Sequence, residues 1–365
     1  MKLSGSEIII ECLKKEGVEF IFGYPGGAVL HIYDALFKAK NIKHVLVRHE
    51  QGATHAADGY ARACGKPGIV LVTSGPGITN CVTGLATAHM DSIPMIIISG
   101  QVSRQYVGSD AFQEADATGI TRPVTKHNFL IDSRESIAEV FKKAFTIATT
   151  GRPGPVLIDI PKDLTDPNIK IPFDYPKKVN IRAYNPPKND SKDKIDQAAK
   201  IICNARKPMI YTGGGVILGK AHTQLQKLAK KLKYPITSTL MGLGGYPCSD
   251  SQFLGMLGMH GTYEANMAMH DCDVLLAIGA RFDDRVTGDT SKFCPSAKII
   301  HIDVDPSSIS KIIEVDLSLI GEASKILRTL NSSIDLNKKN IKTKSIKKWW
   351  GKINKWKARK CLSYK

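Results

Sequence analysis

The first half of the chain alternates short apolar runs with longer stretches of helical periodicity. Residues 41–47 and 68–73 are rich in β-branched and apolar side chains, which is typical of strands. Residues 52–63 are rich in alanine and predict a helix, and another helix is expected from Ile78 to Met90. Further strands are expected at residues 19–22, 94–99 and 156–160, and the last should close the sheet. Repeated units of strand, glycine turn and helix predict a parallel, doubly wound α/β sheet.

The second half repeats this pattern after a change in composition. Residues 163–192 contain five prolines among polar side chains, as a linker would. A new helix is expected from residue 195, and strands at residues 209–212, 235–238, 274–278 and 298–302. We therefore expect an α/β protein with two doubly wound domains, at residues 1–165 and 191–335, a linker at 166–190 and a basic helical tail at 336–365.

Charge and cysteine usage narrow the class of protein. The formal net charge is +17, but twelve Lys and Arg residues lie between Lys338 and Lys365 with no acidic residue among them. Because no recognition motif or aromatic face accompanies this charge, we do not expect nucleic-acid binding. Eight cysteines without CxxC spacing indicate reduced thiols of a cytoplasmic protein. No signal-peptide pattern and no apolar run long enough to span a bilayer are found, so no membrane association is expected.

Glu50 stands where the expected strand at 41–47 ends and the expected helix at 52–63 begins. In open α/β sheets, ligands bind at the carboxyl ends of strands. A helix N-terminus favours the ionised carboxylate and burial favours the neutral form, so a carboxyl group here could share a proton with a ring nitrogen. The alternative, which the sequence favours equally, is that Glu50 only caps the helix. Glycine turns at 23–28 and 74–77 would let a ligand approach the backbone closely.

Two other motifs do not fit the chemistry that they suggest. His49, Glu50 and His55 miss the His-Glu-x-x-His spacing that places two histidines on one helix face, since the second histidine comes two residues late. No metal site is expected there. The Gly213–Gly215 run follows a predicted strand but lacks the full GxGxxG pattern, so it indicates a nicotinamide site only weakly.

Six segments, taken in order, carry a resemblance to a known family. They are Phe-Gly-Tyr-Pro-Gly-Gly at 22–27, Arg-His-Glu-Gln-Gly-Ala at 48–53, Ser-Gly-Pro-Gly at 74–77, Gly-Ser-Asp-Ala-Phe-Gln-Glu at 108–114, Gly-Arg-Pro-Gly-Pro-Val at 151–156 and Gly-Ala-Arg-Phe-Asp-Asp-Arg-Val at 279–286. Together they resemble the thiamine-diphosphate enzymes, specifically the large catalytic subunits of acetolactate synthase (acetohydroxyacid synthase). The segment around Glu50 is shared across thiamine enzymes, whereas Phe112-Gln113 and residues 281–285 are more specific.

The resemblance implies a transferase that joins two 2-oxo acids with loss of CO2, in the biosynthesis of valine, leucine and isoleucine. Pyruvate would be decarboxylated on thiamine diphosphate, and the product would attack pyruvate or 2-oxobutyrate. Glu50 would hydrogen-bond the aminopyrimidine ring and promote the imino form that removes the thiazolium C2 proton. The other implied residues are Gly27 beside the aminopyrimidine, Pro76 and Asn80 against the ring, and Phe112, Gln113 and Lys162 along the substrate channel.

The same resemblance implies that the second domain binds FAD in a structural role, because the condensation has no net redox change. The implied contacts are Arg152, Gly213, Gly214, Gly215, Leu257, Gly258, Met259, His260, Gly279, Ala280, Arg281, Asp283, Asp303, Val304, Gly321, Glu322 and Ala323. Family members bind the cofactor's diphosphate through Mg²⁺, held by a Gly-Asp-Gly motif and a later Asn-Asn pair. Neither motif occurs in this sequence, so we assign no metal ligand. We expect the 365-residue chain to be inactive alone.

The resemblance also implies a homo-oligomer with its active site between subunits, and a regulatory small subunit. Trp349, Trp350 and Trp356 would lie beside a missing neighbouring domain, and we expect them to be exposed and prone to aggregation. Two other functions stay open. One is another thiamine- and FAD-dependent enzyme such as pyruvate oxidase. The other is a non-catalytic scaffold subunit that binds FAD.

Overall fold

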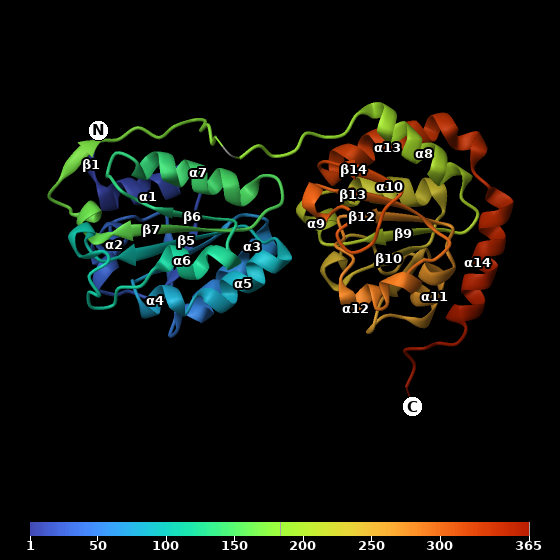
Figure 1. The fold of residues 1–365 in the computed structure, drawn as a ribbon, viewed down its shortest axis with the longest axis horizontal. Coiled ribbons are helices and arrows are strands. Elements are labelled where there is room, and N and C mark those ends of the chain that lie inside the picture. Colours follow the sequence, from blue (N-terminus) through green and yellow to red (C-terminus); the bar gives the residue numbers. More distant parts are fainter. Residues whose placement is uncertain (183, 365) are drawn as a thin grey trace. The chain divides into compact units, whose positions relative to one another are not determined.

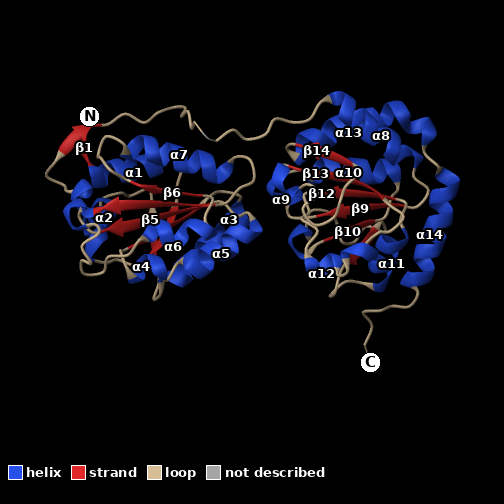
Figure 2. Ribbon diagram, viewed as in Figure 1, coloured by secondary structure: helices blue, strands red, loops and turns tan. Residues whose placement is uncertain are grey.

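The computed structural model describes residues 1–182 and 184–364, which form two compact units. The first unit is Met1–Pro186 and the second is Pro187–Lys365. Each unit carries its own six-stranded sheet with helices on both faces (Figures 1 and 2). The expected α/β class with two parallel-sheet domains is therefore confirmed. No helix in the described part of the chain is long and apolar enough to cross a membrane.

The sheet of the first unit has the strand order β3-β2-β4-β5-β7-β6, and every pair in it is parallel. Its strands are β2 (Phe20–Gly23), β3 (Lys43–Leu46), β4 (Gly68–Val72), β5 (Met95–Gln101), β6 (His127–Leu130) and β7 (Pro155–Pro161). The central strands β4, β5 and β7 are buried along their whole length. Helices on both faces of a parallel sheet account for these unbroken apolar runs.

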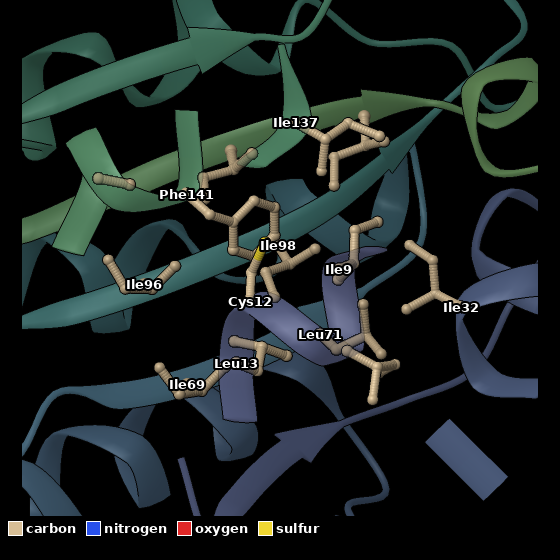
Figure 3. Packing of buried hydrophobic residues seen from close by; sticks show 14 of the residues in the cluster. Ile9, Cys12, Leu13, Ile32, Ile69, Leu71, Ile96, Ile98, Ile137 and Phe141 are labelled. Carbon is tan, nitrogen blue, oxygen red and sulfur yellow. The ribbon is translucent and has the colours of Figure 1, made fainter. Parts of the chain in front are cut away.

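Helices of the first unit cover the two faces of this sheet. They are α1 (Gly5–Lys15), α2 (Leu30–Phe37), α3 (Glu50–Cys64), α4 (Pro76–Thr79), α5 (Val82–Asp91), α6 (Ala117–Thr121) and α7 (Ile137–Thr149). Figure 1 shows α1 and α7 on one face and α3 and α5 on the other. On the first face, Leu13 of α1 and Phe141 of α7 pack against Ile96 and Ile98 of β5 (Figure 3). Each such side chain contributes about 1.5–3 kcal/mol when it is fully buried.

A small antiparallel sheet joins the start of the chain to the segment after β7. It pairs β1 (Lys2–Ser4) with β8 (Lys170–Pro172). Ser4 and Glu7 then form a capping box that begins α1, in which each side chain accepts a hydrogen bond from the other residue's backbone N–H. Part of the segment expected to be a linker thus packs with the first unit.

The sheet of the second unit has the order β11-β10-β9-β12-β13-β14, and it is also parallel throughout. Its strands are β9 (Pro208–Thr212), β10 (Ile236–Ser238), β11 (Phe253–Met256), β12 (Val274–Ile278), β13 (Lys298–Asp303) and β14 (Leu317–Ile320). Its helices are α8 (Lys192–Asn204), α9 (Gly215–Leu218), α10 (His222–Leu232), α11 (Tyr263–Asp271), α12 (Asp284–Thr287), α13 (Ala323–Asn337) and α14 (Thr343–Lys357). Helices α8, α10 and α13 pack on one face, and α11 and α14 on the other.

Short 3₁₀ turns connect several of these elements. They are η1 (Gly27–Val29), η2 (Arg104–Tyr106), η3 (Arg122–Val124), η4 (Lys162–Thr165), η5 (Leu240–Gly242), η6 (Thr290–Lys292), η7 (Pro306–Ser308) and η8 (Lys338–Asn340). Of these turns, η1 and η4 follow β2 and β7 and carry two of the predicted site residues, Gly27 and Lys162.

Two expectations about the first sheet and its helices are wrong. Residues 156–160 do not close the sheet, because β7 lies between β5 and the edge strand β6. The short, partly exposed β6 offers no apolar run that would reveal it. The single helix expected from Ile78 to Met90 is broken at Asn80 and Cys81, which separate α4 from α5. In the second unit, the sequence pattern also missed β11 and β14.

The expectation that the tryptophans near the end of the chain are exposed is also wrong. Trp349 is only 2% exposed, and its Nε1 donates a hydrogen bond to the Pro208 carbonyl at 3.0 Å. Trp350 and Trp356 are half-buried. Helical spacing places Trp349 and Ile353 on one side of α14, where they join the core beside α11. The basic tail is therefore a structural helix of the second unit.

Candidate functional site

Glu50 is the first residue of α3, but it does not cap that helix. The N-cap is His49, whose Nδ1 accepts a hydrogen bond from the Gln51 N–H at 3.1 Å. The capping alternative for Glu50 is therefore wrong. The half-buried Glu50 side chain instead accepts a hydrogen bond at Oε2 from Asn80 Nδ2, at 2.9 Å. The structure thus brings together two residues that the family resemblance assigns to one cofactor.

The break between α4 and α5 allows this contact. Asn80 lies at the break, and the neighbouring Cys81 is buried with its Sγ 3.4 Å from the Gly77 carbonyl. Burial raises the pKa of the Cys81 thiol, and the charge of Glu50 raises it further. Cys81 is therefore a neutral packing group beside the carboxylate, not a competing nucleophile.

Gly27 lies in the turn that follows β2, beside the end of β4. The Ala28 N–H donates a hydrogen bond to Thr73 Oγ1 at 3.3 Å. A Cβ on Gly26 would lie 2.5 Å from the Thr73 Cβ, so packing requires a glycine at that position. A Cβ on Gly27 would meet no atom within 4 Å. The glycine predicted to lie beside a ligand thus has open space on the side where a side chain would project.

The loop with Phe112 and Gln113 packs on the turn that begins α4. Gly75 has a φ of +57°, and a Cβ there would lie 2.6 Å from the Gln113 carbonyl oxygen. Pro76 follows as the first residue of α4. Phe112 is 88% exposed, and Gln113 is exposed as well. The structure therefore places Gln113 next to the turn of Pro76, on the same connection that leads to Asn80.

Lys162 directly follows β7, and the residue after it is tied to a second connection. Asp163 accepts hydrogen bonds from the backbone N–H and the Nε of Arg104, at 2.9 and 2.8 Å. Burial opposes ionisation of Asp163, but these bonds and the charge of Arg104 outweigh it and lower the pKa of Asp163. The Lys162 turn and the segment that leaves β5 are thus joined by an ion pair.

In the second unit, the predicted FAD turns follow neighbouring strands of the sheet. The Gly215 N–H donates to the Gly279 carbonyl at 3.0 Å, and a Cβ on Gly215 would lie 2.7 Å from the Gly279 Cα. Gly279 itself has a φ of +57°. The backbones after β9 and β12 therefore approach each other in a way that only glycines allow. Gly213 and Gly214 belong to the same turn, and Ala280 and Arg281 follow Gly279.

The remaining turns predicted to bind FAD make similar contacts. The Met259 N–H donates to the Arg285 carbonyl at 2.8 Å, which joins the turn of residues 257–260 to the one that begins with Asp283. The Gly321 N–H donates to the Asp303 carbonyl at 2.9 Å. This second bond places Gly321, Glu322 and Ala323 beside Asp303 and Val304. Leu257, Gly258 and His260 are the other members of the first of these turns.

Glu322 and Arg152 already have partners within the chain. The Glu322 carboxylate pairs with Lys325 at 2.8 Å, on the exposed start of α13. Arg152 belongs to the first unit, where its Nε donates to Ser92 Oγ at 2.8 Å.

Sequence reasoning missed two buried polar residues near the first site, Gln101 and Asp159. They hydrogen-bond each other at 3.0 Å across β5 and β7. A visible signal was present, because each is a polar residue inside or at the end of an otherwise apolar strand.

Two family descriptions of thiamine pyrophosphate enzymes match the chain, one in each unit. The family described as "Thiamine pyrophosphate enzyme, N-terminal TPP binding domain" matches residues 3–120. The family described as "Thiamine pyrophosphate enzyme, central domain" matches residues 195–330. The first match contains Gly27, Glu50, Asn80 and Gln113, and the second contains most of the predicted FAD turns.

Curated proteins match along nearly the whole chain. The chain is 55% identical over 364 residues to the acetolactate synthase large subunit of Haemophilus influenzae, and this covers 100% of the chain and 63% of that protein. It is 51% identical over 362 residues to the acetolactate synthase isozyme 3 large subunit of Escherichia coli, covering 99% of the chain and 63% of that protein. A probable acetolactate synthase large subunit of Methanocaldococcus jannaschii is 52% identical over 333 residues, 91% of the chain and 56% of that protein. The chain thus spans less than two thirds of the length of these relatives.

Proposed function

The chain belongs to the thiamine pyrophosphate enzymes, and from this premise we propose that it forms the pyrimidine-binding and FAD-binding parts of an acetolactate synthase large subunit. The proposed reaction condenses pyruvate with pyruvate or 2-oxobutyrate and releases CO2, in the biosynthesis of branched-chain amino acids. The observation that carries this proposal is the hydrogen bond between Glu50 and Asn80 at the carboxyl edge of the first sheet. It lies in the part of the chain that matches the thiamine-binding domain.

The residues at this edge fit the pyrimidine half of thiamine diphosphate. Asn80 holds Oε2 of Glu50, which leaves Oε1 to exchange a hydrogen bond with a ring nitrogen. Gly27 has open space beside its backbone, and Pro76 begins the helix turn that leads to Asn80. When bound, the cofactor supplies the electron sink for decarboxylation. In this proposal, Glu50 holds the proton at the ring nitrogen, and Asn80 keeps the carboxylate in place.

The substrate end of the site would consist of Gln113 and Lys162. A lysine ammonium attracts the carboxylate of a 2-oxo acid, and the amide of Gln113 can donate a hydrogen bond to the same group. The ion pair between Arg104 and Asp163 joins the two connections that carry these residues. We assign these roles as part of the proposal.

The second unit fits FAD as a structural cofactor. The close backbone contacts of Gly215 with Gly279 leave a glycine-lined edge, and the Asp303 carboxylate at the end of β13 could bind a ribose hydroxyl. The proposed condensation needs no electrons from the flavin. Mg²⁺ enters the proposal only through the diphosphate of thiamine diphosphate, and no residue of this chain is assigned to it.

The proposal includes partners and location. It assigns a cytoplasmic homo-oligomer with the active site between subunits, and a regulatory small subunit that the term "large subunit" of the relatives implies. The substrates are the 2-oxo acids named above.

A product assay tests the proposal. We would build a chimeric large subunit in which this chain replaces the aligned residues of the Escherichia coli isozyme 3 large subunit. With thiamine diphosphate, Mg²⁺, FAD and pyruvate, the proposal predicts acetolactate. Acetyl phosphate or acetate would instead indicate an enzyme such as pyruvate oxidase. A flavin absorbance spectrum without any turnover would indicate a non-catalytic scaffold.

A further inference from the structure

Gln101 uses all of its side-chain hydrogen-bonding groups inside the first unit. It is the last residue of β5 and only 4% exposed. Its Nε2 donates to Asp159 Oδ2 at 3.0 Å and to the Ala115 carbonyl at 2.9 Å, and its Oε1 accepts from the Val102 N–H at 2.9 Å. One buried amide thus joins the end of β5, the middle of β7 and a backbone position fourteen residues further along the chain.

Asp159 is an unusual residue for the centre of a buried strand. It is 1% exposed, and its strand partner is Ser99 of β5. Its Oδ1 is buried without a hydrogen-bond partner among the described residues. Burial raises the pKa of Asp159 to about 7, although the hydrogen bond from Gln101 opposes this shift. A buried carboxyl group costs free energy that an apolar side chain would not, so its presence here calls for a role beyond packing.

The segment between Val102 and Asp116 is also held by its own polar groups and by Arg104, which donates hydrogen bonds to Asp163 and to the Asp132 carbonyl. The Glu114 carboxylate accepts hydrogen bonds from the N–H groups of Gly108 and Ala111. Arg104 binds Asp163, the residue after Lys162. The middle of the segment, residues 104–113, is exposed apart from Ala111. Gln101 therefore fastens both ends of an exposed loop to the sheet, since one bond goes to Val102 and another to Ala115.

We propose that Gln101 and Asp159 are positioning residues, which hold the loop of residues 102–116 against the sheet. The held loop keeps Gln113 packed on Gly75 and at a fixed distance from Lys162, the residue that follows β7. Asp159 acts through Gln101, because it orients the amide that binds Ala115. Neither residue contacts the substrate. The identity of the substrate as a 2-oxo acid rests on the proposed function, whereas the anchoring of the loop does not.

Hydrogen–deuterium exchange of the 365-residue chain tests the anchoring without any activity. The variants are Gln101→Met, which removes the amide, Asp159→Leu, which removes the acceptor, and Asp159→Asn, which keeps an acceptor oxygen of the same shape. Gln252→Met is the matched control, because Gln252 also donates to two backbone carbonyls, of Ala229 and Tyr234, but in the second unit. We expect exchange in residues 102–116 to rise about tenfold in both variants, because Gln101→Met removes the hydrogen bond to the Ala115 carbonyl and Asp159→Leu removes the acceptor that orients it.

The conservative variant Asp159→Asn and the control Gln252→Met show whether the effect is specific to the Gln101 anchor. Asp159→Asn should exchange in this loop within about twofold of the parent, and Gln252→Met should leave the loop unchanged. Exchange at the parent rate in Gln101→Met would overturn the proposal. Should Asp159→Leu fail to fold, Gln101→Met and Asp159→Asn still decide it.

A kinetic measurement in the chimeric subunit separates positioning from general stability. Gln101→Met should raise the KM for pyruvate about tenfold, while exchange of the thiamine C2 proton stays within about twofold of the parent. A C2-proton exchange rate about tenfold lower, together with the higher KM, would show a merely structural role and overturn the proposal. If the chimera makes no acetolactate at all, the proposed function fails, and the deuterium-exchange result still stands on its own.

Discussion

At Glu50, the local structure separates two roles that a helix-terminal carboxylate could play. His49 caps α3, so the first free N–H groups of the helix do not need the Glu50 side chain. Asn80 instead holds that side chain from the break between α4 and α5. The Glu50 carboxylate is therefore both close to a helix N-terminus and fixed by an amide. These are the properties that a proton-sharing group at a cofactor ring requires.

Gly27 and Gly75 have different reasons to be glycine, and alanine substitutions should separate them. Gly27→Ala meets no atom within 4 Å, so we expect the free energy of unfolding to change by less than about 0.5 kcal/mol. Gly75→Ala strains a φ of +57° and meets the Gln113 carbonyl, so we expect a loss of about 1–3 kcal/mol.

Urea unfolding monitored by circular dichroism measures both variants. In the chimeric subunit, Gly27→Ala should nevertheless weaken thiamine diphosphate binding, because the new methyl group would occupy space proposed for the ring. Equal stability losses in the two variants would contradict this distinction.

Asp159 should make the first unit less stable as the pH rises. Burial raises the folded-state pKa to about 7, and the nearby charge of Asp116 adds to this effect, whereas the unfolded pKa is about 3.9. The folded state therefore binds the extra proton between these values. The contribution to stability is fully present below about pH 4 and is lost as the pH rises through 7.

The variant Asp159→Asn removes this titration while it keeps the hydrogen-bond acceptor for Gln101. Relative to this variant, the parent should lose about 1.4 kcal/mol of unfolding free energy per pH unit between pH 5 and 6. Urea unfolding of both proteins at several pH values measures the difference. Parallel stability curves for the two proteins would rule out a raised pKa at Asp159.

Among the elements, those with a continuous hydrophobic pattern were predictable and those without one were not. The apolar runs of β4, β5 and β7 were sufficient to predict a buried parallel sheet. The edge strands β6 and β14 are short and partly exposed, so the sequence gives no comparable signal. The helix break at Asn80 also gives no signal in the sequence, because the residues before and after it both have a helical pattern.

The candidate site, too, could be predicted only in part from the sequence. The place of Glu50 at a strand–helix junction follows from local patterns. The contact of Gly75 with Gln113 joins residues far apart in sequence, so it depends on how the loop packs. Of the two buried polar residues that were missed near the site, Asp159 could have been noticed as a carboxylate in an apolar run.

Helix α14 should be part of the cooperative unfolding of the second unit. Trp349→Ala removes a buried ring and the hydrogen bond to Pro208, so we expect a loss of about 3–5 kcal/mol. Trp350→Ala is the matched control, because this neighbouring ring is only half-buried and should cost less. All three tryptophans lie in α14, so their fluorescence reports the docking of this helix during urea unfolding. Equal losses in the two variants would contradict the larger contribution assigned to Trp349.

In the whole molecule, two parallel sheets each present a row of turns at the carboxyl ends of their strands. In the first unit, these turns carry Glu50, Gly27 and Gln113. In the second unit, they carry the glycines proposed to bind FAD. The chain spans 63% of the length of its Haemophilus influenzae and Escherichia coli relatives, so catalysis has to be measured in an assembly. The basic residues of α14 and η8 belong to the surface of the second unit.

The central claim is that Glu50 activates thiamine diphosphate, and exchange of the cofactor's C2 proton with deuterium tests it most directly. We would measure this rate by NMR in the chimeric large subunit and compare Glu50→Gln with Glu139→Gln, which alters an acid in the first turn of α7 away from the site. The account predicts a rate at least about 100-fold lower in Glu50→Gln, because the amide cannot share its proton with the ring, and an unchanged rate in Glu139→Gln. Exchange at the parent rate in a folded, cofactor-loaded Glu50→Gln enzyme would contradict the account.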